Sequence, residues 1–425
     1  MATTTRIRSW LSRAPPPVFG TYALFAAFST YFCMYAYRKP FAVGKYEGAI
    51  SLFGLVIEAK IAFIIAQVLG YTASKFLGIK VVSEMTAGRR AKAIAGAILL
   101  AEASLCLFAV LPNPLKALCL FANGLALGMV WGLVFAFIEG RELSDILGAG
   151  LASSFIVSSG FVKSAGKLVL GWGVSDAWMP AATGALFLLP IAFFIALLAQ
   201  VPPPSPSDER ARLRRMPMDR AARRSFFLSL APGLILLSFA YVLLTAFRDF
   251  RDNFAGEIWS ALGYGKVPEI LTTAELPVAF GALIAVGAVM LVKNSARAIL
   301  VIHGLLVVGA LLIGISTLLF QASIIGPATW MILIGLGLYM GYVPYNCVLF
   351  DRLLPAVGSV GTAGFMIYLT DSLGYFGSTA LLLFKNFAQP QLPWLDFMLG
   401  LSWATAIVCA VLFLASGAYF RARMR

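Results

Sequence analysis

The chain alternates long apolar runs with short polar segments. Twelve runs are long enough to cross a bilayer, roughly 18–42, 50–77, 91–111, 114–138, 146–170, 177–199, 225–248, 268–292, 297–320, 327–350, 357–385 and 394–420. A membrane-spanning helix needs about 20 apolar residues, whereas a barrel strand needs only about ten residues of alternating polarity. The run lengths therefore predict an all-α membrane protein with twelve transmembrane helices.

One interior segment differs from the rest in composition. Residues 201–224 are rich in proline and then in arginine, and they separate six predicted spans from the other six. We therefore expect an N-terminal six-helix half over residues 1–200, a cytoplasmic basic linker over 201–224, and a C-terminal six-helix half over 225–425.

A weak internal repeat indicates that the two halves are related. Arg38 in MYAYRK and Arg248 in LTAFRD are 210 positions apart, and the same offset aligns Phe155 with Phe365. A nearby offset of 212 aligns Glu139 with Asp351, each at the end of the fourth span of its half. Two pseudo-symmetric six-helix bundles around a central cavity are the architecture of one large class of transporters.

The composition excludes most other classes of protein. Hydrophobic residues make up 60% of the 425 residues and charged residues 12%, and the mean hydropathy is +0.88. Polar material is too scarce to cover a water-soluble surface, and a disordered chain or a collagen is excluded as well. The five cysteines are scattered without a metal-binding spacing, so we expect no disulfide framework, no metal and no cofactor.

The net charge of +14 does not indicate a nucleic-acid partner. The 33 Lys and Arg residues lie mostly in short loops on one predicted side of the membrane, together with both termini and the linker. The positive-inside rule then places both termini in the cytoplasm, and we expect a multi-pass protein of a bacterial inner membrane. The apolar run from Val18 to Ala36 is too long for a signal peptide, so it is the first span. We expect a monomer whose partners are the lipid bilayer and a small anionic substrate.

Ionisable residues inside predicted spans are the strongest indication of function, because charge in lipid is costly. In the first span, Tyr31, Tyr35 and Arg38 recur at i, i+4 and i+7, which puts two phenols and a guanidinium on one helical face. The same i, i+4 spacing occurs in the second and fifth spans, and the seventh span supplies a further arginine. The candidate binding residues are Tyr31, Tyr35, Arg38, Lys39, Tyr71, Lys75, Lys163, Lys167 and Arg248.

Two structural alternatives remain open for these cations. Arg38, Lys39 and Lys75 are near span ends, so their side chains could extend to the membrane surface without binding anything. Lys163 and Lys167 are one helical turn apart and repel each other unless an anion or carboxylates neutralise them. Three acids inside predicted spans could do this, or could carry a coupling proton: Glu58, Glu102 and Asp371.

A cationic set of this kind suits an anion. The planar guanidinium of arginine binds phosphate or carboxylate oxygens in pairs, lysine adds charge, and tyrosine hydroxyls complete the shell. No nucleophile–histidine pair, metal-ligand cluster or phosphate-binding loop indicates an enzyme.

The segments YFCMYAYRKPF and YTASKFLG resemble the first and second spans of the organophosphate:phosphate antiporters of the major facilitator superfamily, typified by the glycerol-3-phosphate transporter. The resemblance implies the major facilitator fold and a substrate-binding role for the tyrosines and cations of these segments. It also implies that Arg38 and Arg248, late in the seventh span, form a phosphate-binding pair.

The sequence departs from that pattern at three places. Those antiporters carry a histidine in the fifth span, whereas the only histidine here is His303 in the ninth, so Lys163 could substitute for it. The loop between the second and third spans carries Glu84 and Arg89 instead of the usual Asp-Arg motif. After Arg248 comes an acidic, aromatic segment typical of an uncharacterised bacterial branch, which leaves the substrate open.

The leading interpretation is a secondary active transporter of a small organic anion, bearing phosphate or carboxylate, that works by exchange and alternating access. The first alternative is a proton-coupled carrier of another solute, siderophore-like or peptide-like, with one of the three acids as its proton site. The second is a transporter-shaped receptor, which would bind its ligand without moving it across the membrane.

Overall fold

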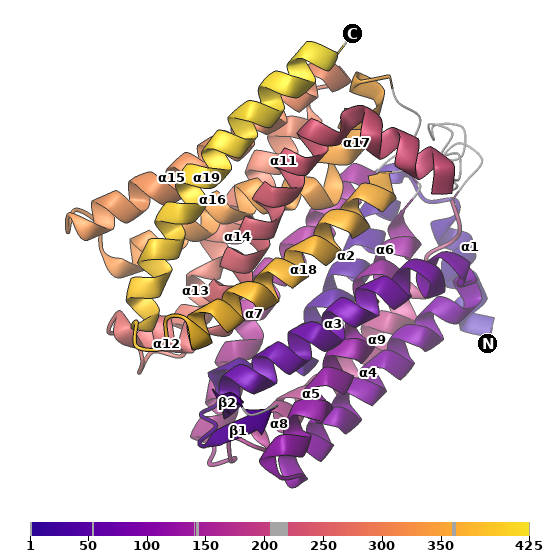
Figure 1. Ribbon diagram of the computed structural model, residues 1–425. Helices are drawn as coiled ribbons and strands as arrows, with labels where there is room; N and C mark the ends of the chain where they lie inside the picture. Colours follow the sequence, from indigo (N-terminus) through magenta and orange to yellow (C-terminus); the bar gives the residue numbers. More distant parts are fainter. Residues whose placement is uncertain are drawn as a thin grey trace. The chain divides into compact units, whose positions relative to one another are not determined.

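The computed structural model describes residues 2–52, 55–139, 141, 144–204, 220–358 and 363–424, and this part of the chain is almost entirely helical (Figure 1). Ten helices of this part are long and apolar enough to cross a membrane, and one bent pair makes an eleventh span. A further helix, α18 (Ala363–Phe387), has 25 residues and would be about 37 Å long, which is enough to cross as well. The predicted all-α membrane architecture is confirmed.

The described residues form two compact units, which we call unit 1 and unit 2. Unit 1 contains residues 2–204 with the short segments Asn253–Gly256 and Gly265–Thr272. Its elements are α1 (Ala2–Leu11), α2 (Pro16–Met34), η1 (Tyr35–Tyr37), η2 (Pro40–Val43), β1 (Ala49–Leu52), β2 (Leu55–Glu58), α3 (Ala59–Glu84), α4 (Ala87–Val110), α5 (Asn113–Leu127), α6 (Val130–Ile138), α7 (Ser144–Gly171), α8 (Met179–Leu186) and α9 (Leu188–Leu198).

Unit 2 contains the rest of the described C-terminal part of the chain. Its helices are α11 (Arg220–Asn253, apart from its last residue), α14 (Glu275–Met290), α15 (Ser295–Gln321), α16 (Pro327–Cys347), α17 (Leu349–Ala356), α18 and α19 (Trp394–Arg423). The short helices α12 (Ala255–Ala261) and α13 (Ile270–Thr273) follow α11. Most of the predicted basic linker, residues 205–219, is outside the described residues.

The first span is shorter than predicted, and its end carries the site. Helix α2 begins with two prolines in its first turn, where a missing N–H is tolerated, and ends at Met34. A 3₁₀ turn follows, and Arg38 is its C-terminal cap. Pro40 prevents an α-helix from continuing here, because it has no N–H to bond the carbonyl oxygen of Ala36 and its ring would clash with that oxygen. Arg38 is therefore on irregular backbone and not on a continuous helical face with Tyr31.

The second span also begins later than predicted. Strands β1 and β2 pair antiparallel, with Ala49 opposite Glu58. Ile57 is buried while Val56 and Glu58 are exposed, an alternation typical of a strand with one covered face. The prediction that Glu58 is inside a span is therefore wrong: it ends β2, directly before α3 begins.

Small residues let helices of each unit approach closely. In unit 1, a side chain at Gly70 of α3 would collide with the backbone oxygen of Phe121 in α5, and one at Gly124 would collide with that of Gln67. In unit 2, Gly309 of α15 faces Gly337 of α16 in the same way, and α15, α16 and α19 run side by side (Figure 1). Such contacts strengthen packing where lipid offers no hydrophobic driving force.

Candidate functional site

The first cluster of predicted site residues lies in unit 1, where α2 ends. Arg38 is 4% exposed, and its guanidinium carbon is 3.8 Å from the ring centroid of Tyr71 and 5.9 Å from that of Tyr35. The ammonium of Lys75 is 5.3 Å from the same Tyr71 centroid, and the Tyr71 hydroxyl is 3.5 Å from that of Tyr31. The structure thus brings together three phenols and two cations that the sequence analysis singled out.

Two amide side chains hold the irregular backbone at this point. Gln67 of α3 donates hydrogen bonds to the carbonyl oxygen of Arg38 at 3.1 Å and to the amide oxygen of Asn123 at 2.9 Å. Asn123 of α5 donates in turn to the carbonyls of Tyr37 at 3.0 Å and Ala101 at 3.2 Å. Carbonyls that lose their helical partners where α2 stops are thereby satisfied. The sequence analysis missed both amides.

Two more cations are buried in unit 1. Lys39 is 2% exposed and donates a hydrogen bond of 2.9 Å to the side-chain oxygen of Asn253, which belongs to the same unit. Lys163 is 3% exposed in α7, which packs against α2, η1 and η2. The burial of Arg38 and Lys39 contradicts the alternative that these two side chains extend to the membrane surface. Lys75, at 5% exposed, is buried as well.

Lys167 is placed differently from Lys163, one turn away on the same helix. It is partly exposed, and its ammonium donates to the carbonyl oxygen of Gly265 at 3.4 Å. The nearby Ser164 hydroxyl contacts the same outer segment, through the carbonyl of Pro268 at 2.8 Å. The two lysines therefore have separate surroundings, and the structure does not bring Lys167 into the buried cluster.

The second cluster lies in unit 2 around Arg248. Its guanidinium donates to the Oδ1 atom of Asp249 from Nε at 3.1 Å and from Nη2 at 2.7 Å. Nη2 also donates to the hydroxyl of Tyr375 at 3.2 Å, and Nη1 donates to the hydroxyl of Tyr342. The other carboxylate oxygen of Asp249 accepts a hydrogen bond of 2.9 Å from Ser378. Most donors of Arg248 are therefore already occupied within the unit.

A second buried acid is part of the same network. Asp371 is 7% exposed and accepts a hydrogen bond of 3.1 Å from the hydroxyl of Tyr241, which also accepts one of 3.3 Å from Asn346. The ring of Tyr241 stacks on that of Tyr342, with centroids 5.0 Å apart. The sequence analysis named Arg248 and Asp371 but missed Asp249 and the tyrosines, although Asp249 directly follows Arg248 in the sequence.

Glu102 is the third predicted coupling acid and lies in α4 of unit 1. Its side chain is partly buried, and Oε2 has no hydrogen-bond partner in the part of the chain that the structure describes. A side chain at Gly184 of α8 would collide with this oxygen, so the carboxyl group packs directly against that helix. The ring of Tyr37 borders the same glycine, and its hydroxyl is likewise buried without a described partner.

The histidine of the predicted ninth span has side-chain contacts within unit 2. His303 contacts the carbonyl of Ile299 at 2.8 Å through Nδ1 and the hydroxyl of Ser416 at 3.1 Å through Nε2, which links α15 to α19. Among the described residues, no group of three His, Cys, Asp or Glu side chains could hold a metal ion.

The fold is shared with solved membrane transporters. The structure is similar to that of a D-xylose-proton symporter, with a TM-score of 0.63 and 12% identity over 93% of this chain and 97% of that one. It is also similar to a mutant of the peptide transporter POT in complex with alafosfalin, with a TM-score of 0.58 and 16% identity over 98% and 99% of the two chains. The sulfate complex of that mutant is similar as well, with a TM-score of 0.61 and 14% identity over the same shares of the two chains. The predicted major facilitator fold is confirmed.

Comparison at the level of sequence gives a narrower result. No curated protein matches the chain significantly. A family model described as "Family of unknown function (DUF5690)" matches residues 40–423, which include every predicted binding residue except Tyr31, Tyr35, Arg38 and Lys39. Since that match covers most of the 425 residues, the protein belongs to the family of unknown function DUF5690.

Proposed function

We propose that the protein is a secondary active transporter of a small organic anion bearing a phosphate or carboxylate group. The cluster of Arg38, Lys39, Lys75 and Lys163 in unit 1 is its anion site. The resemblance to the organophosphate:phosphate antiporters supports this proposal, and so does the fold shared with transporters of other substrates.

One observation carries the proposal: the charge balance of the unit 1 spans. Four cations of this unit are 5% exposed or less, namely Arg38, Lys39, Lys75 and Lys163. The membrane-spanning helices of the same unit contain a single acidic residue, Glu102. Burial of net positive charge in a low dielectric is costly, and a bound anion offsets that cost. A phosphate or carboxylate accepts hydrogen bonds from a guanidinium and from tyrosine hydroxyls, and Arg38 lies against Tyr35 and Tyr71.

The same charge balance favours exchange over one-way transport. Reorientation of an empty transporter would enclose the buried cations of unit 1 without a bound anion, whereas reorientation of the loaded transporter would enclose them with one. Movement should therefore be slow when the site is empty and fast when it is loaded, which is the kinetic behaviour of an exchanger.

The test has two stages. Thermal unfolding of the purified protein, screened against phosphorylated and carboxylated metabolites, identifies ligands by the rise in melting temperature. Proteoliposomes are then loaded with the best ligand, with inorganic phosphate, or with neither, and uptake of labelled ligand is measured. We expect fast uptake only with trans anion, and loss of uptake in Arg38→Lys. A ligand that binds but never crosses in any of these vesicles would contradict transport and support a receptor.

A second candidate function is favoured by Glu102. Its carboxyl oxygen is buried in α4 without a described hydrogen-bond partner, which suits a group that gains and loses a proton during transport. A proton-coupled carrier would accumulate its solute, siderophore-like or peptide-like, in empty vesicles under an imposed proton gradient. A protonophore would abolish that uptake and Glu102→Gln would uncouple it. Exchange that is insensitive to both treatments would contradict this candidate.

Orientation in a bacterial inner membrane is part of the proposal. Because basic residues concentrate near the termini and in the linker, we expect reporter fusions after Gly173 and Lys266 to read as external, and one after Pro204 as cytoplasmic. An external reading after Pro204 would contradict the orientation without affecting the anion site.

A further inference from the structure

The carboxyl group of Glu102 lies beside the residue that directly precedes Arg38. A Cβ atom at Gly184 of α8 would collide with Oε2 of Glu102 and would be 3.1 Å from Cδ1 of Tyr37, so both side chains border the same glycine. Tyr37 is 0% exposed, and its hydroxyl and Oε2 of Glu102 are both buried without a hydrogen-bond partner among the described residues. Two buried oxygens of this kind call for a proton or another partner that the transport site has not yet used.

A single amide connects this acid to the anion site. Nδ2 of Asn123 donates hydrogen bonds to the carbonyl oxygens of Tyr37 at 3.0 Å and Ala101 at 3.2 Å, the residues directly before Arg38 and Glu102. A carbonyl oxygen lies about 3 Å from the Cα atom of the next residue, so the Cα atoms of Arg38 and Glu102 are at most about 12 Å apart. The structure thus holds the acid of the spans close to the arginine of the proposed site.

At this distance the charge of Glu102 acts on an anion bound at Arg38, whatever other contacts either residue makes. An ionised carboxylate repels the anion, and a protonated carboxyl group does not. For two unit charges about 12 Å apart at an effective dielectric constant of about 20, the difference corresponds to about tenfold in Kd. Salt screens buried charges less than exposed ones, so the effect should persist at ordinary ionic strength.

We propose that a proton on Glu102 and the anion at Arg38 bind together, so that this carboxyl group sets the affinity of the anion site. The inference rests on the proposed function, since it needs an anion at Arg38. Linkage is reciprocal: if protonation of Glu102 strengthens anion binding, anion binding draws a proton onto Glu102 by the same factor. The anion is then bound more tightly on the more acidic side of the membrane.

The other titratable groups around Glu102 keep their charge between about pH 5 and 7.5. Helix α4 packs mainly against α5, α6, α8, α9 and η1, of which α6, α8 and α9 contain no titratable side chain. The titratable residues of α5, η1 and the rest of α4 are Tyr35, Tyr37, Arg89, Arg90, Lys92, Cys106, Lys116 and Cys119. Phenols, thiols, ammonium and guanidinium groups ordinarily titrate above about pH 8.

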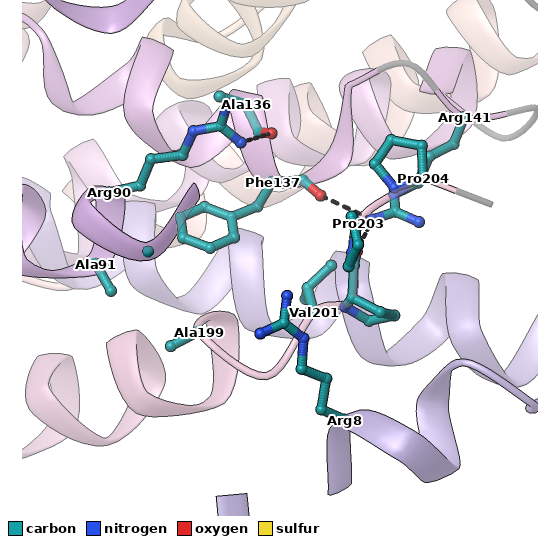
Figure 2. A pocket seen from close by; sticks show the side chains of 12 residues that line it. Arg8, Arg90, Ala91, Ala136, Phe137, Arg141, Ala199, Val201, Pro203 and Pro204 are labelled. Carbon is teal, nitrogen blue, oxygen red and sulfur yellow. Dashed lines mark hydrogen bonds between the residues drawn. The ribbon is translucent and has the colours of Figure 1, made fainter. Parts of the chain in front are cut away.

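The cations of α4 itself are far from its acid. Arg90 is in the first turn of the helix, about 18 Å along the axis from Glu102. Its Nη1 donates to the carbonyl oxygen of Ala136 at 2.8 Å, at the pocket shown in Figure 2. Glu102 is therefore the group on and around α4 whose charge changes in this pH range.

The test measures binding of sulfate to the full-length protein in detergent, because sulfate keeps its charge over this pH range. Glu102→Gln fixes the neutral form of the side chain, and Glu102→Asp keeps a titratable carboxyl group. Glu58→Gln is the matched control, since it removes the same charge from an exposed residue at the end of β2. Calorimetric titration at about pH 5 and 7.5, in two buffers of different ionisation enthalpy, gives Kd and the number of protons taken up. His303 titrates in the same range, and its contribution is common to all variants.

We expect the wild type to bind sulfate about tenfold more weakly at pH 7.5 than at pH 5, and to take up protons on binding. Glu102→Gln should keep the tighter affinity at both pH values and take up fewer protons, whereas Glu58→Gln and Glu102→Asp should follow the wild type. The same pH dependence in the wild type and Glu102→Gln would overturn the proposal and leave the anion site intact.

Two other outcomes are informative. If Glu102→Gln does not fold, the wild type and Glu102→Asp decide: proton uptake on sulfate binding in both would support the proposal, and its absence would overturn it. No binding of sulfate by the wild type at either pH would contradict the anion site at Arg38 itself, and the proposal with it.

Discussion

The two arginine clusters are built on a similar frame and carry opposite balances of charge. In unit 1, Tyr31 precedes Arg38 by seven residues, and its ring is 5.0 Å from that of Trp131. In unit 2, Tyr241 precedes Arg248 by seven residues, and its ring is 5.0 Å from that of Tyr342. In each unit, the tyrosine seven residues before the arginine thus packs on an aromatic residue of the unit's fourth span.

The residue after each arginine makes the difference. Lys39 follows Arg38, so unit 1 has two adjacent buried cations, and Lys39 donates to a neutral amide. Asp249 follows Arg248 and forms an ion pair of 2.7 Å with it. Unit 2 thus contains the counterion of its own arginine, whereas the spans of unit 1 contain one acid for several cations. If the proposed function holds, we expect unit 1 to provide most of the anion affinity, while Asp249 holds Arg248 in place in unit 2.

The largest effect should come from removing the counterion in unit 2. Asp249→Asn leaves the charge of Arg248 buried, because the side chains of the pair are 2% and 11% exposed. Loss of one partner of a buried ion pair typically destabilises by about 3–5 kcal/mol. Lys39→Gln, at the equivalent position of unit 1, should lower the melting temperature less, because Lys39 donates to a neutral amide. Equal destabilisation by both changes in thermal unfolding would break the comparison.

The next effect concerns binding. Arg38→Lys keeps the charge but removes the paired donors, so it should weaken anion binding by about 1.5–3 kcal/mol, or roughly tenfold to a hundredfold in Kd. Arg248→Lys should change Kd less, because Asp249 and two tyrosines already occupy most donors of Arg248. Titration of the best ligand by thermal shift measures both. A larger loss in Arg248→Lys would reverse the assignment of the two units.

The extent of the cationic cluster in unit 1 can be tested within one helix. Lys163→Ala should weaken anion binding about tenfold, since it removes a buried charge. Lys167→Ala, one turn away, removes a partly exposed lysine that contacts Gly265, and should leave Kd unchanged. Similar losses in the two variants would mean that Lys167 belongs to the site after all.

The smallest expected effect is on stability and concerns Tyr241 and Tyr31, the tyrosines seven residues before the two arginines. Tyr241→Phe removes hydrogen bonds to Asp371 and Asn346 and should destabilise by about 1 kcal/mol. Tyr31→Phe removes a weaker contact of 3.5 Å with Tyr71, so its effect on the melting temperature should be smaller, while ligand binding falls. A stability loss confined to Tyr31→Phe would contradict the assigned roles.

Much of the fold could be predicted because lipid imposes a length on apolar helices. The pairing of β1 with β2 could not be predicted, since the apolar strand β2 leads directly into the apolar start of α3 and a short run has no clear period. In the site, Tyr71 and Lys75 could be predicted from their i, i+4 spacing. Tyr342 and Tyr375 could not be predicted, because they contact Arg248 from positions 94 and 127 residues later in the sequence.

The amide pair of Gln67 and Asn123 has a mechanical consequence. It ties the backbone of Tyr37 and Arg38 to α3 and α5, which cross in direct backbone contact at Gly70 and Gly124. Because the chain leaves helical geometry after Met34, the arginine is coupled more stiffly to these two helices than to α2. If unit 1 changes conformation during transport, we expect Arg38 to move with the α3–α5 pair while α2 tilts at its end.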